Sequence, residues 1–205
     1  MKKCCVVVMC LLIVAGMCSC SWGDVPIDAA HFPDEVFREH VREYDTDGNN
    51  TLSDAELASV SSIDVSGSSA EPGSITSLKG IEHFTTLMFL NCSYNRLADL
   101  DVRTNKALTE LMCTGNHLAV LNIGENTALE KLNCGINSLT ALDVSKNIAL
   151  EYLECSKNAL TALDVSKNTA LKTLYCWGNQ LTAFGYHSQH AAGESELLTK
   201  SHHRT

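Results

Sequence analysis

Apolar residues recur through the middle of the chain at a constant step of 21 residues. Two columns of this pattern keep one residue type through five copies: Leu87, Leu108, Leu129, Leu150 and Leu171 in one, and Cys92, Cys113, Cys134, Cys155 and Cys176 in the other. A fixed period of about 20 residues is typical of a solenoid, in which each turn of chain buries its apolar positions against the next turn. The sequence therefore predicts a rod of stacked turns.

Each turn contains two short stretches in which apolar and polar residues alternate. Leu90-Asn91-Cys92 is one, and Leu100-Asp101-Val102 is the other. Such alternation indicates a strand with one buried side. A turn of 21 residues, at about 3.3 Å per residue, has a perimeter of about 70 Å at most, which leaves no room for a long helix. We expect a helix-poor coil with a parallel sheet along each half.

Asparagine fills two further columns, which we place at the corners of the coil. The first ladder is Asn95, Asn116, Asn137, Asn158 and Asn179, and the second is Asn105, Asn126, Asn147 and Asn168. Corners leave backbone N–H and C=O groups unpaired inside the coil, and an inward amide can pair with both kinds in the adjacent turn. We expect both ladders to be structural.

The five copies between residues 87 and 184 follow the pattern LxxLxCxxNxLxxLDVxxNxx. This pattern resembles the leucine-rich repeat, and it is most similar to the 21-residue repeats of internalin-like bacterial surface proteins. The resemblance covers about residues 75 to 184. It implies a leucine-rich repeat solenoid, β-rich and helix-poor, with a specific binding face made by positions that vary between turns. The last copy departs from the pattern at Phe184, where LDVSKN is expected.

The outward positions of the first strand vary from turn to turn, whereas the inward positions do not. We take this strand as the candidate ligand-binding face, with Phe89, Tyr152, Glu154, Tyr175 and Trp177 as its main residues. Aromatic side chains anchor protein interfaces and stack on sugars, so the expected ligand is a protein or a glycan. The alternative is that these aromatics only suit strand structure.

The cysteines and the acidic residues of the repeat have two interpretations each. The five repeat cysteines stand in one column with parallel Cβ directions, so we expect buried free thiols; a zinc ladder or catalytic thiol lacks a nearby His, Asp or Glu at a fixed spacing. Asp101, Asn122, Asp143 and Asp164 form an outward column. They either bind cations or cap the turns and keep the rod soluble, with Lys146 and Lys167 offsetting their charge.

The stretch before the repeats contains a twelve-residue loop that resembles an EF-hand. Oxygen ligands fall at the expected positions as Asp45, Asp47, Asn49, Ser53 and Glu56, and Thr51 offers its carbonyl. Asn50 replaces the usual glycine, and asparagine tolerates the left-handed conformation better than most residues. The competing interpretation, a capping box of Ser53 and Glu56, does not explain the other ligands. We expect a small helix-loop-helix segment with a structural Ca²⁺ site.

The chain divides into five expected segments: a signal peptide at 1–23, the helix-loop-helix at 24–60, an N-terminal cap and degenerate repeat at 61–86, five repeats at 87–184, and an irregular tail at 185–205. The basic start and short apolar run predict export without a transmembrane span. Cleavage near Gly23 gives a secreted protein, and lipid attachment at Cys20 gives an outer-membrane lipoprotein. His187, His190, His202 and His203 in the tail are weak metal candidates.

The formal net charge of −9 and the lack of a clustered Lys/Arg face argue against nucleic-acid binding. No nucleophile, zinc or phosphate-loop motif of known enzymes occurs, so we expect no enzyme activity. The preferred hypothesis is a secreted or cell-surface adhesion protein that binds a protein or glycan. The alternative is a structural or assembly component, which includes a truncated fragment of a longer repeat protein.

Overall fold

The computed structural model describes residues 23–185. The expected signal peptide, the lipid-attachment cysteine Cys20 and the tail histidines therefore lie outside the described residues. Within residues 23–185, no helix is both long enough and apolar enough to cross a bilayer.

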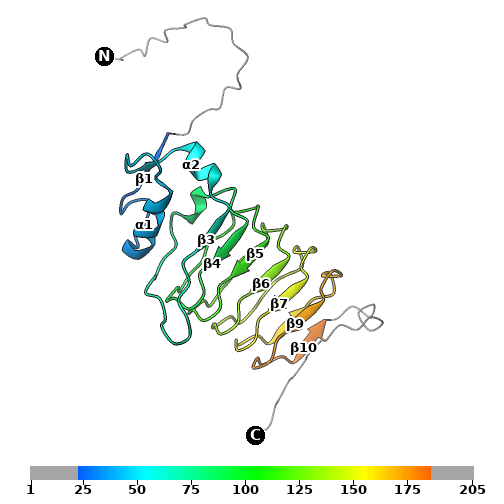
Figure 1. The fold of residues 1–205 in the computed structure, drawn as a ribbon. Helices are drawn as coiled ribbons and strands as arrows, with labels where there is room; N and C mark the ends of the chain where they lie inside the picture. The colour runs from blue at the N-terminus through cyan, green and yellow to red at the C-terminus, as the bar shows by residue number, and fades with distance from the viewer. Residues whose placement is uncertain (1–22, 186–205) are drawn as a thin grey trace, which may run out of the picture.

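Short strands dominate the described chain, and its helices lie near the N-terminus. The helices are α1 (Glu35–Val41), η1 (Arg42–Tyr44), α2 (Asp54–Ser59) and η2 (Ile81–His83). The strands are β1 (Val25–Pro26), β2 (Thr51–Leu52), β3 (Ser62–Asp64), β4 (Phe89–Asn91), β5 (Glu110–Met112), β6 (Lys131–Asn133), β7 (Tyr152–Glu154), β8 (Ala162–Asp164), β9 (Thr173–Tyr175) and β10 (Ala183–Gly185). Figure 1 shows the strands from β3 onward stacked into a rod, with α1 and α2 at its N-terminal end.

The main sheet runs along the whole rod. Its six parallel strands follow the order β3-β4-β5-β6-β7-β9, so each turn adds one strand beside the preceding one. In the five strands of this sheet from β4 to β9, the central leucine, beginning with Leu90, is fully buried, and the two flanking residues lie on the outer side. The leucines, cysteines and valines of successive turns form one continuous core. The expected leucine-rich repeat solenoid, β-rich and helix-poor, is confirmed.

The second half of each turn does not form the continuous sheet that we expected. In the described chain its strand pairing is limited to β8 with β10 and a single bridge between Asp101 and Asn122. In this half the backbone enters a chain reversal instead. The Val102 carbonyl accepts one hydrogen bond from Asn105 N at 3.0 Å and a second from Asn126 Nδ2 at 2.8 Å. The Val102 carbonyl thus takes part in a chain reversal and in a bond to an asparagine of the next turn.

The first asparagine ladder pairs with both kinds of backbone group, as expected. The Asn116 Oδ1 atom accepts from Leu97 N at 3.0 Å, and its Nδ2 atom donates to Cys92 O at 3.0 Å; both partners belong to the preceding turn. The same bonds recur for Asn137 and Asn158. This ladder therefore joins neighbouring turns at the corner that follows the main sheet.

The second ladder fulfils only half of the prediction. Asn126 Nδ2 donates to Val102 O and to Asn105 O, at 2.8 and 2.9 Å, but its Oδ1 atom is buried without a partner in the described chain. The N–H groups within reach of this corner are already used, because Asn105 N and Leu108 N bond to carbonyls of their own turn. An amide oxygen that faces only occupied donors stays unpaired.

The N-terminal segment closes the first end of the rod. Phe32 is fully buried and contacts Phe37 and Phe84, with ring centroids 6.1 and 6.5 Å apart. It packs directly on Gly80, where a Cβ atom would lie 2.2 Å from the Phe32 ring. Asp34 caps α1 and also accepts two hydrogen bonds from Thr76, at 2.8 and 2.9 Å. These contacts hold α1 against the rod.

Candidate functional site

The loop that resembles an EF-hand lies between η1 and α2. Gly48 and Asn50 both adopt left-handed backbone, with φ of 71° and 62°, so the expectation that Asn50 accepts this conformation is confirmed. Helix α2 begins with Ser53 as its N-cap, and Ser53 and Glu56 form a complete capping box. The two interpretations of this segment are thus compatible, because the capping box uses residues that also belong to the expected ligand set.

Three of the six expected calcium ligands come together. One oxygen each from Asp45, Asp47 and Glu56 lies within 4.8 Å of the others. Asn49 does not join them, since its Oδ1 atom accepts two hydrogen bonds from Thr51, at 2.7 and 2.5 Å. Ser53 bonds to Glu56 through its hydroxyl. Asp45 accepts backbone N–H groups of the loop with both oxygens: Oδ1 accepts two of them, and Oδ2 accepts one and keeps a second lone pair.

Glu56 connects the two ends of the loop. Its Oε1 atom accepts from Thr46 N at 2.7 Å and from the Thr46 hydroxyl at 2.8 Å, and its Oε2 atom accepts from Ser53 N at 2.9 Å. The side chain is 8% exposed. These hydrogen bonds, above all those from Ser53 and Thr46, lower the pKa of Glu56 to about 2. The carboxylate is therefore ionised at any physiological pH, which is the form that a cation requires.

A strand from the start of the described chain covers the backbone of this loop. β1 pairs antiparallel with β2, placing Val25 opposite Leu52, and Ile27 N donates to Asn50 O at 3.0 Å. Paired EF-hands join their loops through strands, and here residues 25–27 provide the pairing for a single loop. Neither the repeat nor the loop pattern predicted this contact, because a two-residue strand leaves no periodic signal.

The expected binding face has one compact part and one separate residue. Tyr152 and Glu154 stand on the same side of β7, and Tyr175 lies directly opposite Glu154 on β9. The two tyrosine rings meet edge to face, with centroids 6.0 Å apart. Trp177 follows on the next outward position and is 42% exposed. Phe89 lies in β4, three strands before β7, or about 14 Å away at the usual strand spacing. We call Tyr152, Glu154, Tyr175 and Trp177 the aromatic face.

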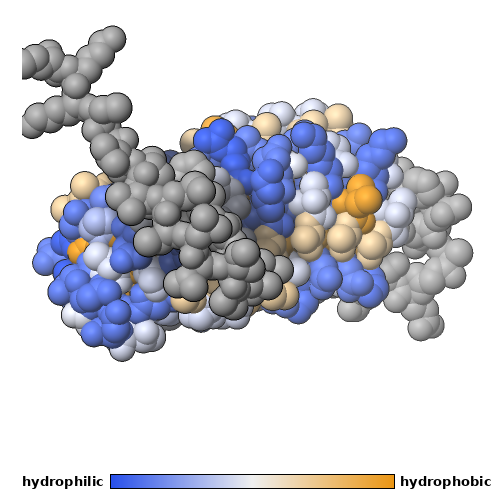
Figure 2. Space-filling model, turned by 90° about the horizontal axis from the view of Figure 1, so that it is seen from above, coloured by the Kyte–Doolittle hydropathy of each residue, from blue (hydrophilic) through white to orange (hydrophobic). Residues whose placement is uncertain are grey.

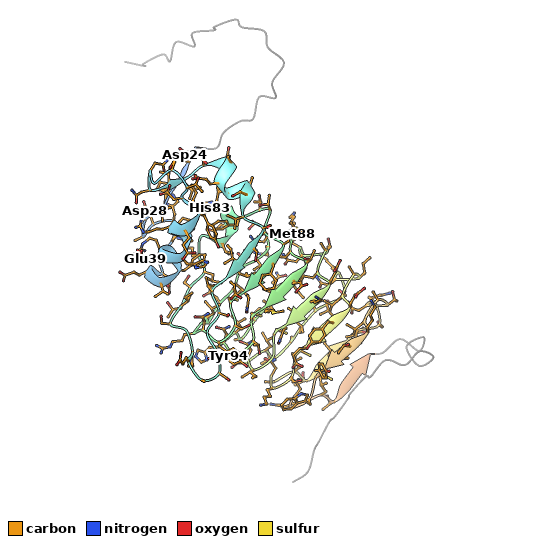
Figure 3. The ribbon with its side chains drawn as sticks, in the orientation of Figure 1. Asp24, Asp28, Glu39, His83, Met88 and Tyr94 are labelled. Carbon is orange, nitrogen blue, oxygen red and sulfur yellow. The ribbon has the colours of Figure 1, made fainter. Side chains whose placement is uncertain are left out.

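Sequence reasoning missed two residues that border the aromatic face. The Lys157 ammonium lies 4.8 Å from the centre of the Trp177 ring, in a cation–π contact. Ile136 is 43% exposed and, like Lys157, adopts a left-handed backbone, with φ of 52° and 53°. Both belong to a column of corner positions that begins with Tyr94. Figure 3 labels Met88 and Tyr94, which lie before and after strand β4. Gly115 and Gly178 stand in the same column and also adopt left-handed backbone, so these glycines were the sequence signal for the conformation of Ile136 and Lys157.

Other hydrophobic side chains on the rod are separate from each other. Val120 and Ile148 are 72% and 63% exposed, and neither belongs to the main sheet. On the side seen in Figure 2 the surface is mostly hydrophilic, and strongly hydrophobic groups are few. The aromatic face differs because its rings contact one another.

Comparison with solved structures gives matches to leucine-rich repeat proteins of bacteria. The functional domain of InlJ from Listeria monocytogenes, described as including a cysteine ladder, is 38% identical with a TM-score of 0.71; the alignment covers 79% of this chain and 35% of that one. This chain is an internalin-like leucine-rich repeat protein. It spans about a third of the length of the InlJ structure. No protein-family model and no curated protein matched the sequence.

Two further structures share the fold at lower identity. A leucine-rich repeat protein of Leptospira interrogans has a TM-score of 0.57 at 24% identity. The alignment covers 62% of this internalin-like chain and 33% of the Leptospira protein. The internalin InlF of Listeria monocytogenes has a TM-score of 0.57 at 22% identity, and the alignment covers 78% of this chain and 58% of InlF. At this level of identity the likeness concerns the solenoid alone.

The cysteine ladder of this internalin-like chain consists of free, buried thiols, as expected. Cys92, Cys113, Cys134, Cys155 and Cys176 are all unpaired with one another. Burial raises the pKa of Cys92 to about 12 and that of Cys113 and Cys134 well above the ordinary value. Because the thiolate is the reactive form, these groups are poor nucleophiles and metal ligands. They act as small core residues.

The aspartate column caps turns. Asp143 Oδ1 accepts from Ser145 N and Asp164 Oδ1 accepts from Ser166 N, both at 2.9 Å. Asp101 also pairs with Arg103, whose Nη2 atom lies 2.7 Å from Oδ2. Hydrogen bonds from Arg103 lower the pKa of Asp101 to about 2. The column therefore stabilises each turn locally, which is the second of its two interpretations.

Proposed function

We propose that this chain is a noncatalytic binding module that recognises a protein through its aromatic face. The observation behind the proposal is that Tyr152, Tyr175 and Trp177 gather on the outer side of consecutive turns. Tyrosine and tryptophan are the residue types that contribute most energy at protein interfaces. They combine a large apolar surface with a polar group, and they lose little conformational freedom on binding.

The scaffold beneath this face supports the same proposal. Leu153 and Leu174, which lie under the tyrosines, are fully buried, and the register of β7 with β9 is continuous with the rest of the sheet. Residues on a rigid sheet hold their relative positions without an ordering cost on binding. The internalin-like neighbours and the apolar start of the sequence favour a secreted or cell-surface location and a role in adhesion.

The test is capture by the immobilised full chain from a preparation of extracellular proteins, read by mass spectrometry. Replacing Tyr152, Tyr175 and Trp177 by alanine should abolish capture of the specific ligand. A matched control, Val120→Ala with Ile148→Ala, removes exposed apolar groups elsewhere and should leave capture unchanged. Capture that survives the triple substitution contradicts the proposal. Loss of the ligand after protease treatment, but not after glycosidase treatment, identifies it as a protein.

We also propose that the loop at 45–56 binds Ca²⁺ and that the ion stabilises the N-terminal segment. Asp45, Asp47 and Glu56 would supply carboxylates, and Asn49 would have to turn from Thr51 to supply its amide oxygen. Such a site suits the millimolar Ca²⁺ outside cells, because a single loop of this kind binds weakly. Binding to the folded state alone raises the melting temperature.

Thermal unfolding of the full chain with and without millimolar Ca²⁺ tests this site. Ca²⁺ should raise the melting temperature, and Asp45→Ala with Glu56→Gln should remove the increase. Asp28→Asn, which changes an acidic residue outside the loop, serves as the control. This variant should still show the increase in melting temperature with Ca²⁺. Absence of a calcium-dependent shift in the parent chain would rule out the site.

A further inference from the structure

The lysines around the aromatic face are already engaged. Lys131 Nζ lies 2.7 Å from Glu110 Oε1, and Lys172 Nζ lies 2.7 Å from Glu151 Oε2. Lys157 lies over the Trp177 ring. Each cation near the face thus has an anionic or aromatic partner within the molecule.

Glu154 is different, since it takes part in none of the ion pairs found within residues 23–185. Its Oε1 atom accepts one hydrogen bond, from Ser156 N at 2.8 Å. The carboxylate lies next to both tyrosines, since Tyr152 is two residues earlier on the same strand and Tyr175 is the register partner on the neighbouring strand. Its negative charge adds to the effect of burial in raising the pKa of Tyr152. A carboxylate bordered by two rings is therefore left without a cation in the described chain.

A small residue on the preceding turn makes room for this carboxylate. A Cβ atom at Gly135 would lie 3.0 Å from Glu154 Oε1. The other turns have Ser93, Thr114, Ser156 and Trp177 at the corresponding position. The residue that borders Glu154 on the preceding turn is thus the one without a side chain.

Ser156 supplies an independent sign of a missing partner. The residue is 2% exposed, and its hydroxyl oxygen is buried with no hydrogen-bond partner in the described chain. It continues the outward alternation of Tyr152 and Glu154. Burying a hydroxyl without a partner is costly, so such groups in natural proteins usually pair in some state of the molecule.

From these contacts we infer that the aromatic face accepts an arginine side chain of the partner protein, with its guanidinium on Glu154 and against the tyrosine pair of Tyr152 and Tyr175. This inference rests on the proposed function and specifies the chemistry of the partner. The guanidinium has five N–H donors in a planar fork, which can pair with a carboxylate and a hydroxyl together. Its flat surface also stacks against aromatic rings. An ammonium group offers the charge without the plane, so lysine binds more weakly here.

The Ser156 hydroxyl becomes accessible to this side chain only if a neighbouring group moves. Trp177 occupies the equivalent position one turn later and is held from outside by Lys157. Occupation of the site should therefore change the environment of the Trp177 ring. The chain has two tryptophans, Trp22 and Trp177, so a Trp22→Phe background makes this ring the single reporter.

The experiment titrates the full chain carrying Trp22→Phe with capped tetra-arginine, tetra-lysine and the neutral isostere tetra-citrulline. The readout is Trp177 fluorescence, together with calorimetry. Tetra-arginine should change the fluorescence in a saturable way and bind severalfold more tightly than tetra-lysine, and tetra-citrulline should not bind. Glu154→Gln should weaken tetra-arginine about tenfold, because it removes the charge and keeps the acceptor for Ser156 N.

The matched control is Asp143→Asn, which removes the same charge from the other half of a turn. Asparagine already fills this column at Asn122, so the turn is preserved. Equal weakening by Glu154→Gln and Asp143→Asn would overturn the inference, because binding would then follow net charge alone; equal binding of citrulline would overturn it as well. If these outcomes occur while the triple alanine variant still loses its captured protein, the proposed function stands and only the arginine assignment fails.

Discussion

The two halves of each turn solve the same physical problem in different ways. In the first half, backbone groups pair between turns, strand beside strand, from β3 to β9. In the second half they pair within the turn, through successive chain reversals and aspartate caps. Both halves come from similar stretches of sequence, LxxLxC and LxxLDV. The two halves therefore differ in backbone pairing although both contribute apolar residues to one core.

The asparagine ladders reflect this difference. Where the sheet ends, an N–H group of the preceding turn is free to reach the amide oxygen, and the ladder pairs fully. Where the turns reverse, every N–H group nearby is used locally, and the amide oxygens of Asn105, Asn126 and Asn147 stay unpaired in the described chain. The more deeply buried ladder is thus the one with unpaired oxygens, so deeper burial of the same side chain does not mean greater stabilisation.

The largest expected effect comes from removing one asparagine from each ladder. Asn116→Ala leaves Leu97 N buried without an acceptor, so it should lower the free energy of unfolding by about 3 kcal/mol. Asn126→Ala should cost only about 1 kcal/mol, because Val102 O and Asn105 O each keep a backbone donor and an unpaired oxygen is removed with the side chain. Urea unfolding of both variants measures the difference. Equal losses would show that the two ladders are equivalent.

A smaller effect is expected at the left-handed corner that closes the first half. Gly115→Ala places a Cβ atom 2.6 Å from the Tyr94 ring at a φ of 67°, and should cost about 1 to 2 kcal/mol. Ile136→Gly should do the opposite and stabilise by up to about 1 kcal/mol, since a β-branched residue is strained there. The midpoints of urea unfolding give both values. A loss of stability in Ile136→Gly would mean that the exposed isoleucine makes contacts that outweigh the strain.

The smallest effect concerns the acid stability of the second half. Hydrogen bonds from Ser145 and Ser166 lower the pKa of Asp143 and Asp164 below the ordinary value of 3.8, and Arg103 lowers that of Asp101 further. Groups with a lowered folded pKa stabilise above their unfolded pKa, and this contribution is lost as the pH falls through the folded value.

Wild type should therefore lose stability below about pH 4, and the variant with asparagine at Asp101, Asp143 and Asp164 should lose less over the same range. Melting temperatures from about pH 6 to pH 2 test the difference. Because these aspartates are exposed, the change should be modest. An identical slope in both proteins would assign the acid sensitivity to other groups, of which Glu56 is the first candidate.

Much of the fold could be predicted from the sequence, because a repeated period determines which side chains are inward. The leucine and cysteine columns predicted the core, and the asparagines predicted the corners. The second sheet was predicted only in part, because strand pairing in this half is limited in the described chain to β8 with β10 and one bridge. Alternation in Leu100-Asp101-Val102 does not reveal the reversal in which Asn105 N bonds to Val102 O. Hydrogen-bond competition of this kind depends on the turn geometry and leaves no periodic trace.

The candidate sites were predictable only in part. Residue type and spacing predicted the acidic loop, but not that Asn49 bonds to Thr51 or that β1 pairs with β2. On the sheet, the register of 21 residues brought Tyr152, Glu154 and Tyr175 together and left Phe89 apart. The Ser156 hydroxyl could not have been found from sequence, because its isolation arises from packing.

The asparagine bonds have a direction along the chain. Asn95, Asn116, Asn137, Asn158 and Asn179 each donate to a carbonyl that precedes them by one turn or more, and the second ladder does the same. A turn is therefore fastened by residues synthesised after it. Each turn therefore depends at its corner on the turn that follows it, so the loss of one turn withdraws side-chain donors from the turn before it.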